Sequence, residues 1–98
     1  MGKIKKILCV CQAGLGSSLI LGMNVEKVLE AMGKGDIRVE HTSLGDTTTG
    51  MADLYIAGGD IYEQVKVFGP CVAIHNLVNK NEIREVLEKY FEENPDEE

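Results

Sequence analysis

The sequence predicts an α/β fold: a three-layer sandwich in which a four-stranded parallel sheet, in the order 2-1-3-4, carries helices on both faces. Two observations lead to this prediction. Short apolar runs alternate with segments of helical periodicity along the 98 residues, as in chains that build parallel sheets through helical crossovers. The first run is largely apolar, which is typical of a strand buried on both faces. Because crossover connections are right-handed, placing this strand inside the sheet leads to the stated order.

The first half of the chain is predicted to form strand, loop, helix and strand. Residues 4–10 are the buried first strand. A helix begins near Ser17 and ends at Gly33 and Gly35, because glycines are frequent just beyond helix C-termini. Its apolar residues recur at helical spacing: Leu21, Val25, Val28, Leu29 and Met32. Residues 37–42 alternate apolar and polar side chains, which predicts a half-exposed strand near an edge of the sheet.

The middle of the chain is predicted to add a third strand and a short helix. Residues 43–52 are rich in Thr and Gly and lack periodicity, so they form a loop or one helical turn. Residues 54–57 form the strand, and a glycine pair ends it. Asp60 and Glu63 stand at capping-box spacing, which predicts that Asp60 caps the short helix.

The last part of the chain is predicted to form the fourth strand and a longer helix. Residues 71–74 are the strand. Asn79 and Glu82 repeat the capping-box spacing and mark the start of the helix, which runs until Pro95. Its apolar residues follow at regular helical spacing: Ile83, Val86, Leu87, Tyr90 and Phe91.

One loop carries the chemistry that the sequence offers. The run from Cys11 to Ser18 joins the first strand to the first helix. Gly14 and Gly16 allow successive backbone N–H groups to turn toward one point, and the following helix adds the positive end of its dipole. Such a loop stabilises a phosphoryl dianion and equally the thiolate form of Cys11, the candidate nucleophile. The hydroxyls of Ser17 and Ser18 are expected to bind phosphoryl oxygens, and one of them to cap the helix.

Composition and charge exclude several classes of protein. A net charge of -6 argues against a nucleic-acid binder, which would carry a basic stripe. No apolar run approaches the roughly 20 residues that span a bilayer, so no direct membrane insertion is expected. Three cysteines, an odd number, indicate a reducing compartment and hence the cytoplasm. The length predicts a single domain over residues 1–92, followed by an acidic, frayed tail over residues 93–98.

The cysteine loop resembles that of a known family. The pattern Cys11-x-x-Gly14-x-Gly16-Ser17-Ser18 is similar to the IIB component of the bacterial phosphoenolpyruvate-dependent sugar phosphotransferase system, and most similar to its ascorbate-type branch. The resemblance implies that Cys11 takes phosphate from a phosphohistidine of the IIA protein. It passes the phosphate to a sugar, ascorbate-like or a polyol, bound by the membrane component IIC. The implied phosphate cradle is Gln12, Ala13, Gly14, Leu15, Gly16, Ser17 and Ser18. The implied fold is flavodoxin-like, as in low-molecular-weight phosphatases, and no metal or cofactor is expected.

Two other interpretations of the chain stay open. A low-molecular-weight phosphatase or arsenate reductase resembles it through Cys-x5-Arg-Ser, but Ser17 stands where the arginine would be, so the guanidinium clamp is missing. No Asp-Pro pair follows the fourth strand to supply a general acid. The second alternative is a non-catalytic binding or regulatory module with a flavodoxin-like layout. A nucleotide-binding loop is not expected, because its Gly-Lys-Ser/Thr is absent.

The remaining reactive side chains are given mainly structural roles. Cys9 and Cys71 are expected in the core. His75 is expected at the edge of the sheet that carries the cysteine loop, as a loop residue rather than a phosphate contact, and His41 lies one strand over. The three threonines at positions 47–49 either line the rim of the cysteine loop or face solvent.

Overall fold

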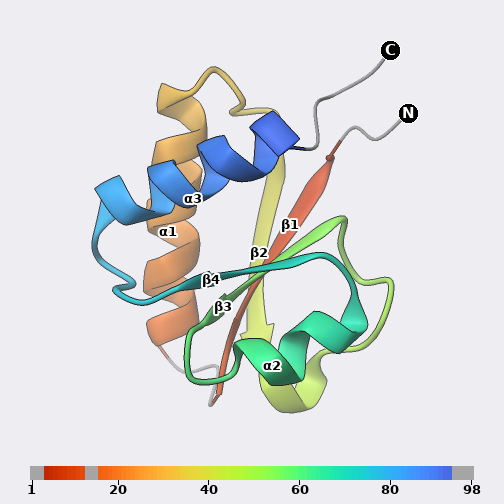
Figure 1. Cartoon of the computed structure of the whole chain (residues 1–98). Coiled ribbons are helices and arrows are strands. Elements are labelled where there is room, and N and C mark those ends of the chain that lie inside the picture. The colour runs from red at the N-terminus through yellow and green to blue at the C-terminus, as the bar shows by residue number, and fades with distance from the viewer. Residues whose placement is uncertain (1–3, 13–15, 94–98) are drawn as a thin grey trace.

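The computed structural model, which describes residues 4–12 and 16–93, contains a four-stranded sheet in which every paired strand runs parallel (Figure 1). The strands are β1 (Lys6–Cys11), β2 (Arg38–Ser43), β3 (Leu54–Gly58) and β4 (Cys71–Ile74). Their order is β2-β1-β3-β4, which confirms the order predicted from the sequence.

Helices and helical turns fill the connections. They are α1 (Ser17–Ala31) after β1, the 3-10 turn η1 (Leu44–Asp46) after β2, α2 (Tyr62–Val65) with the 3-10 turn η2 (Lys66–Phe68) after β3, and α3 (Lys80–Glu93) after β4. The segment 43–52, predicted as a loop or one helical turn, contains the 3-10 turn η1. Of the predicted acidic tail, only Glu93 is described, as the last residue of α3.

Two hydrophobic cores, one on each face of the sheet, create the three layers. Figure 1 shows α1 and α3 over one face and α2 over the other. Alternate residues of β1 serve the two cores, because successive side chains of a strand point to opposite faces. Ile7 and Cys9 pack in the core under α1 and α3, whereas Leu8 and Val10 pack in the core under α2. The predicted core position of Cys9 is confirmed.

The C-terminus of α1 ends at a glycine, as predicted. Gly33 has a φ of 78°, in the left-handed region that favours glycine. Its N–H donates to the carbonyl of Glu30 at 3.1 Å, and the N–H of Lys34 donates to the carbonyl of Leu29 at 2.8 Å. These two bonds form a Schellman motif, which satisfies the last carbonyls of the helix and turns the chain toward β2.

The two predicted helix caps have different outcomes. Asn79 caps α3, because its Oδ1 accepts a hydrogen bond from the backbone N–H of Glu82 at 3.1 Å. The cap predicted at Asp60 is wrong, since Ile61 is the N-cap of α2 and no side chain makes a cap hydrogen bond there. The physical reason is a turn between β3 and α2, in which the N–H of Ile61 donates to the carbonyl of Gly58 at 3.1 Å. The helix therefore begins after this turn, beyond the reach of an Asp60 cap.

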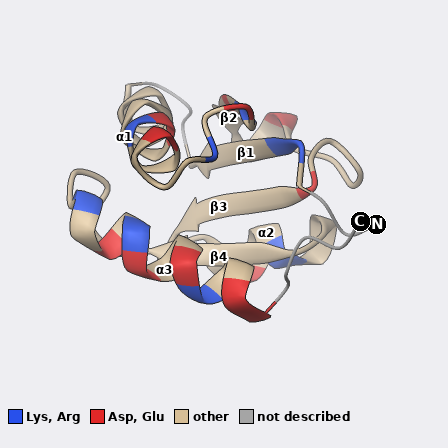
Figure 2. Ribbon diagram, turned by 90° about the horizontal axis from the view of Figure 1, so that it is seen from above, with Lys and Arg blue, Asp and Glu red and all other residues tan. Residues whose placement is uncertain are grey.

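Charged side chains lie mainly on the helices. Figure 2 shows acidic and basic residues along α3, whereas β3 and β4 are free of them. Over the described ranges 4–12 and 16–93, none of the helices combines the length and the apolar character that crossing a bilayer requires.

Candidate active site

A cavity of about 580 Å³ opens at the carboxyl ends of β1, β3 and β4. The register brings these ends together, because Val10 lies beside Ala57 and Gly58 lies beside Ile74. The lining residues are Cys11, Gln12, Ser17, Gly58, Gly59, Asp60, Ile74, His75 and Leu77. Ligands of open parallel sheets bind at this edge, which is where the sequence predicts the site.

Cys11 differs from the other two cysteines in its position. It ends β1 and lines the cavity, with 7% of the residue exposed. Burial, aided by the nearby Cys11 and Glu26, raises the pKa of Cys9 far above its ordinary value. Burial also raises the pKa of Cys71 to about 12, although this residue is half-buried against the second core and not enclosed in it. Both thiols therefore stay protonated at neutral pH.

The N-terminus of α1 faces the same cavity. Its N-cap is Gly16, whose φ of 67° lies in the left-handed region. The predicted cap by Ser17 or Ser18 is wrong, because both lie inside the first helical turn and no side-chain cap bond forms. Ser17 lines the cavity, whereas Ser18 is fully buried with its Oγ 3.3 Å from Nδ1 of His41 on β2. Three predicted cradle residues lie outside the described residues: Ala13, Gly14 and Leu15.

The missing side-chain cap has a chemical consequence. The first N–H groups of a helix have no partner within the helix. Among the described residues no side chain occupies them at α1, so they are available to an anion in the cavity. The helix dipole favours negative charge at the same place.

The glycine pair after β3 makes room for two titratable side chains. A Cβ at Gly58 would come within 2.8 Å of Oδ1 of Asp60, and a Cβ at Gly59 would come within 3.1 Å of Cδ2 of His75. These glycines therefore do more than end the strand. They allow the Asp60 carboxylate and the His75 ring to lie against the backbone at the cavity wall.

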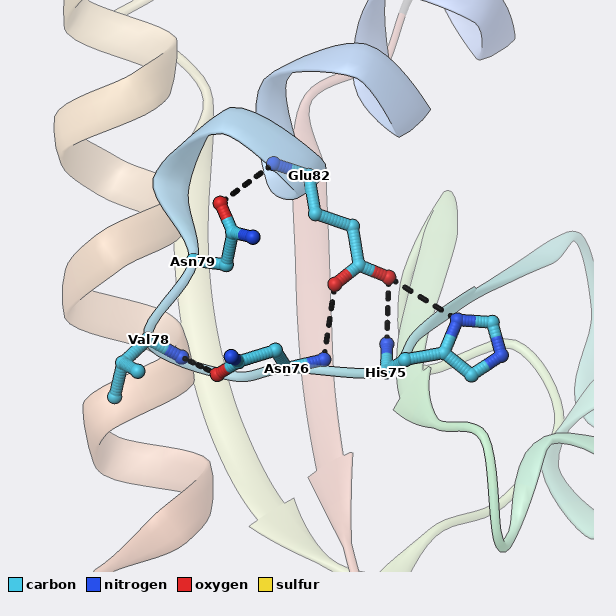
Figure 3. Close-up of polar contacts among 5 residues, drawn as sticks. All are labelled: His75, Asn76, Val78, Asn79 and Glu82. Carbon is cyan, nitrogen blue, oxygen red and sulfur yellow. Dashed lines mark hydrogen bonds and ion pairs between the residues drawn. The ribbon is translucent and has the colours of Figure 1, made fainter.

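Glu82 of α3 holds the loop that follows β4 (Figure 3). Its carboxylate accepts hydrogen bonds from the backbone N–H groups of His75 at 2.7 Å and Asn76 at 2.9 Å, and it lies 3.1 Å from Nδ1 of the His75 ring. The hydrogen bond from the backbone N–H of His75 is the main cause that lowers the pKa of Glu82, and the bonds from Asn76 and from the His75 ring add to it. Desolvation raises the pKa, but the hydrogen bonds outweigh it. Glu82 is therefore ionised at neutral pH.

Two residues that shape this wall were not identified from the sequence. Glu82 was predicted only as the partner of Asn79, and its spacing does not reveal the contact with the loop. Asn24, in the middle of α1, donates from Nδ2 to the carbonyl of Leu77 at 2.9 Å. The one hint was the residue type, because asparagine is unfavourable in a helix interior unless its side chain has another partner.

The threonines at positions 47–49 do not line the cavity. Thr47 is buried, contrary to both predicted alternatives, and its Oγ1 donates to the carbonyl of the last residue of β2 at 2.8 Å. Thr48 and Thr49 are exposed. The hydroxyl of Tyr55 donates to the carbonyl of Thr48 at 2.6 Å and accepts from the N–H of Met51 at 2.9 Å. This segment is therefore tied down over the second core.

The ionisable side chains of the cavity are Cys11, Asp60 and His75. Among the described residues that line it there is no lysine or arginine. A phosphoryl group in this cavity would thus be bound by backbone N–H groups and neutral polar side chains such as those of Gln12 and Ser17. The arrangement suits a nucleophilic thiol that carries a phosphoryl group.

Comparisons with known proteins agree on the class of protein. The family described as "PTS system, Lactose/Cellobiose specific IIB subunit" matches residues 6–89. The ascorbate-specific PTS system EIIB component of Mycoplasma pneumoniae is 32% identical over 91 residues, which cover 85% of this chain and 90% of that protein. The structure of the lactose-specific IIB component domain from Streptococcus pneumoniae matches with a TM-score of 0.53 at 19% identity, covering 96% of this chain and 100% of that chain. At this identity the last match shows the fold alone.

The fold and the matches define a component of a sugar phosphotransferase system. This chain belongs to the lactose/cellobiose-specific IIB family of that system. Both the family that the Cys11 loop resembles and the predicted flavodoxin-like fold are confirmed. The role of the family is sugar phosphotransfer, in which IIB components work with IIA and IIC partners.

Proposed function

We propose that this protein is the phosphocarrier of a sugar-uptake system, and that Cys11 carries the phosphoryl group between a phosphorylated IIA protein and a sugar bound by the membrane component IIC. The transfers take place in the cytoplasm. The observation that carries the proposal is the position of Cys11, which lines the cavity beside the N-terminus of α1. The other two thiols lie outside the cavity and have raised pKa values.

In the first transfer, the Cys11 thiolate attacks the phosphorus of the IIA phosphohistidine. A sulfur–phosphorus bond forms, the nitrogen–phosphorus bond breaks, and the imidazole of the donor keeps the electron pair. The negative charge in the transition state is spread over three phosphoryl oxygens and is best stabilised by donors that are already in place. The proposed donors are the backbone N–H groups of loop residues 12–18, including those at the start of α1.

In the second transfer, a hydroxyl oxygen of the sugar attacks the same phosphorus. An oxygen–phosphorus bond forms, and the sulfur–phosphorus bond breaks with its electron pair returning to Cys11. The hydroxyl proton passes to a base. Because Ser17 stands where phosphatases of low molecular weight place an arginine, the site lacks the bidentate clamp that stabilises hydrolysis. This difference favours transfer of the phosphoryl group over its loss to water.

The test is phosphorylation by labelled phosphoenolpyruvate and the donor proteins of the system, ending with IIA. We expect the label on Cys11 by peptide mapping and no label in Cys11→Ser, whose circular dichroism should match the wild type. Cys71→Ala is the matched control, because it removes a thiol outside the cavity and should accept label at the wild-type rate. Label on His75 or His41, or no label at all, would overturn the proposal. Cys11-dependent hydrolysis of an aryl phosphate would favour a phosphatase.

The proposed acceptor is an ascorbate-like sugar or a polyol. Support comes from the 32% identity to a relative named for ascorbate. The test uses membrane vesicles that contain the IIC component, with L-ascorbate, galactitol, lactose and cellobiose supplied in turn. We expect phosphorylation of ascorbate or galactitol. Phosphorylation of lactose or cellobiose alone would contradict this choice of substrate and leave the role of Cys11 intact.

A further inference from the structure

The Glu82 carboxylate holds the His75 ring in one orientation. Nδ1 of the ring lies 3.1 Å from Oε2 of Glu82, and the same oxygen accepts the backbone N–H of His75 at 2.7 Å. An ionised carboxylate only accepts hydrogen bonds, so Nδ1 carries the proton of the neutral ring. Nε2 is then left with a free lone pair. Figure 3 shows this second nitrogen on the side of the ring away from Glu82.

His75 lies at the cavity that contains Cys11. Both His75 and Gly59 line this cavity. A Cβ at Gly59 would lie 3.1 Å from Cδ2 and 3.5 Å from Nε2, so it is this edge of the ring that packs against the glycine. The side chain of His75 is 83% exposed, which leaves Nε2 accessible to a molecule that enters the cavity.

The two transfers place different demands on a base. The nucleophile of the first transfer is a thiolate, which has no proton to lose. The nucleophile of the second is a neutral hydroxyl, whose proton must leave as the oxygen–phosphorus bond forms. Imidazole is the side chain best matched to this task near neutral pH. A base beside the phosphoryl group therefore assists the delivery of phosphate and has no role in its acceptance.

We propose that His75 is the catalytic base of the second transfer, with Glu82 as the positioning residue. This inference rests on the proposed function, in which Cys11 carries the phosphoryl group. Nε2 of His75 accepts the hydroxyl proton while the sugar oxygen bonds to phosphorus and the Cys11 thiolate leaves. The ring becomes an imidazolium, whose charge the Glu82 carboxylate stabilises, and it releases the proton to water afterwards.

The other ionisable groups around His75 fit this assignment. Glu82 on α3 contacts the ring, while Asp60, after β3, and Cys11, at the end of β1, line the same cavity. A carboxylate is ordinarily too weak a base for efficient proton abstraction at neutral pH. Among the described residues, Asp60 also makes no side-chain hydrogen bond comparable to the contact between Glu82 and the His75 ring.

The experiment measures the two transfers separately. Loading is the rate at which the labelled IIA protein phosphorylates Cys11. Unloading is the rate at which isolated phosphoprotein passes the label to the sugar that the wild type serves, in vesicles containing IIC. We expect His75→Ala to load within about twofold of the wild type and to unload roughly 10²-fold more slowly, the lower end of the range for general-base catalysis.

Two further readouts separate a base from a merely structural residue. Added imidazole should restore part of the unloading rate of His75→Ala, because the exposed site leaves room for it. The dependence of the unloading rate on pH should also differ between the wild type and His75→Ala. Glu82→Gln should also slow unloading, by a smaller factor. Glu88→Gln, which removes another hydrogen-bonded carboxylate of α3, is the matched control and should leave both rates unchanged.

The outcomes distinguish this inference from the proposed function. Unloading that is unaffected in His75→Ala would overturn the base, and so would equal losses in loading and unloading, which would indicate a phosphate contact or a damaged fold. Failure of the wild type to load at Cys11 would overturn the proposed function first. A wild type that loads but delivers phosphate to none of the sugars offered would overturn the second transfer together with its base.

Discussion

Replacing Glu82 by Gln is expected to weaken the loop after β4 enough to be measured as a loss of global stability. The carboxylate accepts two backbone N–H groups and lies within hydrogen-bond distance of the His75 ring. Glutamine has one acceptor oxygen, so at least one backbone bond is lost. A hydrogen bond to a charged group contributes roughly 1.5 to 3 kcal/mol. Because the side chain is 21% exposed and water replaces part of this, we expect a loss of about 1 to 2 kcal/mol at pH 7.

The dependence of this loss on pH follows from the lowered pKa of Glu82. The backbone N–H of His75 is the main cause of that shift. A carboxyl whose pKa is lower in the folded state stabilises the fold fully above its unfolded pKa of about 4.3. The stabilisation is lost as the pH falls through the lower, folded value. The gap between the wild type and Glu82→Gln should therefore be widest near neutral pH and shrink as the pH falls below the unfolded pKa and through the folded one.

Urea denaturation followed by circular dichroism checks this prediction. For a domain of this size, each kcal/mol corresponds to a Tm shift of about 4 to 8 °C, so thermal unfolding gives a second measurement. Glu88→Gln is the control, because Glu88 makes an exposed pair with Arg84 at 2.8 Å. Such a pair contributes only about 0.3 to 0.5 kcal/mol. Equal losses in the two variants, or a Glu82→Gln gap that stays constant from pH 7 to 3, would refute the reasoning.

Three shorter predictions concern the thiols, α1 and the core. Iodoacetamide at neutral pH should alkylate Cys11 in the folded protein and spare the other two cysteines, whose pKa values are raised by burial; their labelling before unfolding would be contrary evidence. Gly16→Ala should lower the free energy of unfolding, measured by urea denaturation, by about 1 to 2 kcal/mol, because the φ of Gly16 is positive. Gly45→Ala is the control and should have little effect, because Gly45 has no positive φ and an added Cβ would contact nothing. Leu21→Ala should cost about 2 to 5 kcal/mol by the same assay, and the half-exposed Leu19→Ala far less.

The sheet was predictable because its pattern is repeated along the chain. β1, β3 and β4 are short, mainly apolar runs, whereas β2 alternates apolar and polar residues. Parallel topology with right-handed crossovers then leaves few possible strand orders. The location of the cavity followed from the same argument, since residues after the strands of a parallel sheet meet at one edge. Cys11 and His75 could thus be assigned to one edge without knowledge of any contact between them.

The contacts that give the site its chemistry were less predictable. Asn79 and Asp60 have the same spacing to a glutamate, yet only Asn79 caps a helix, because the turn after β3 delays the start of α2. Local spacing does not contain this information. Ser18 and His41 are likewise brought together by the packing of α1 on β2. Contacts between residues far apart in sequence depend on the finished packing of side chains, which local patterns do not specify.

The strand order has a consequence for how the protein folds. β1 pairs with β2 through Lys6 and Arg38, and with β3 through Ile7 and Leu54. Both pairings therefore join residues that lie far apart in the sequence. No hairpin is available among these strands to form a local nucleus, and the entropy of closing long loops must be overcome before the pairs contribute. Refolding is therefore expected to be slower than that of a helical bundle of similar length. On the ribosome, β2 emerges before β3, so β1 lacks its second partner until β3 has emerged.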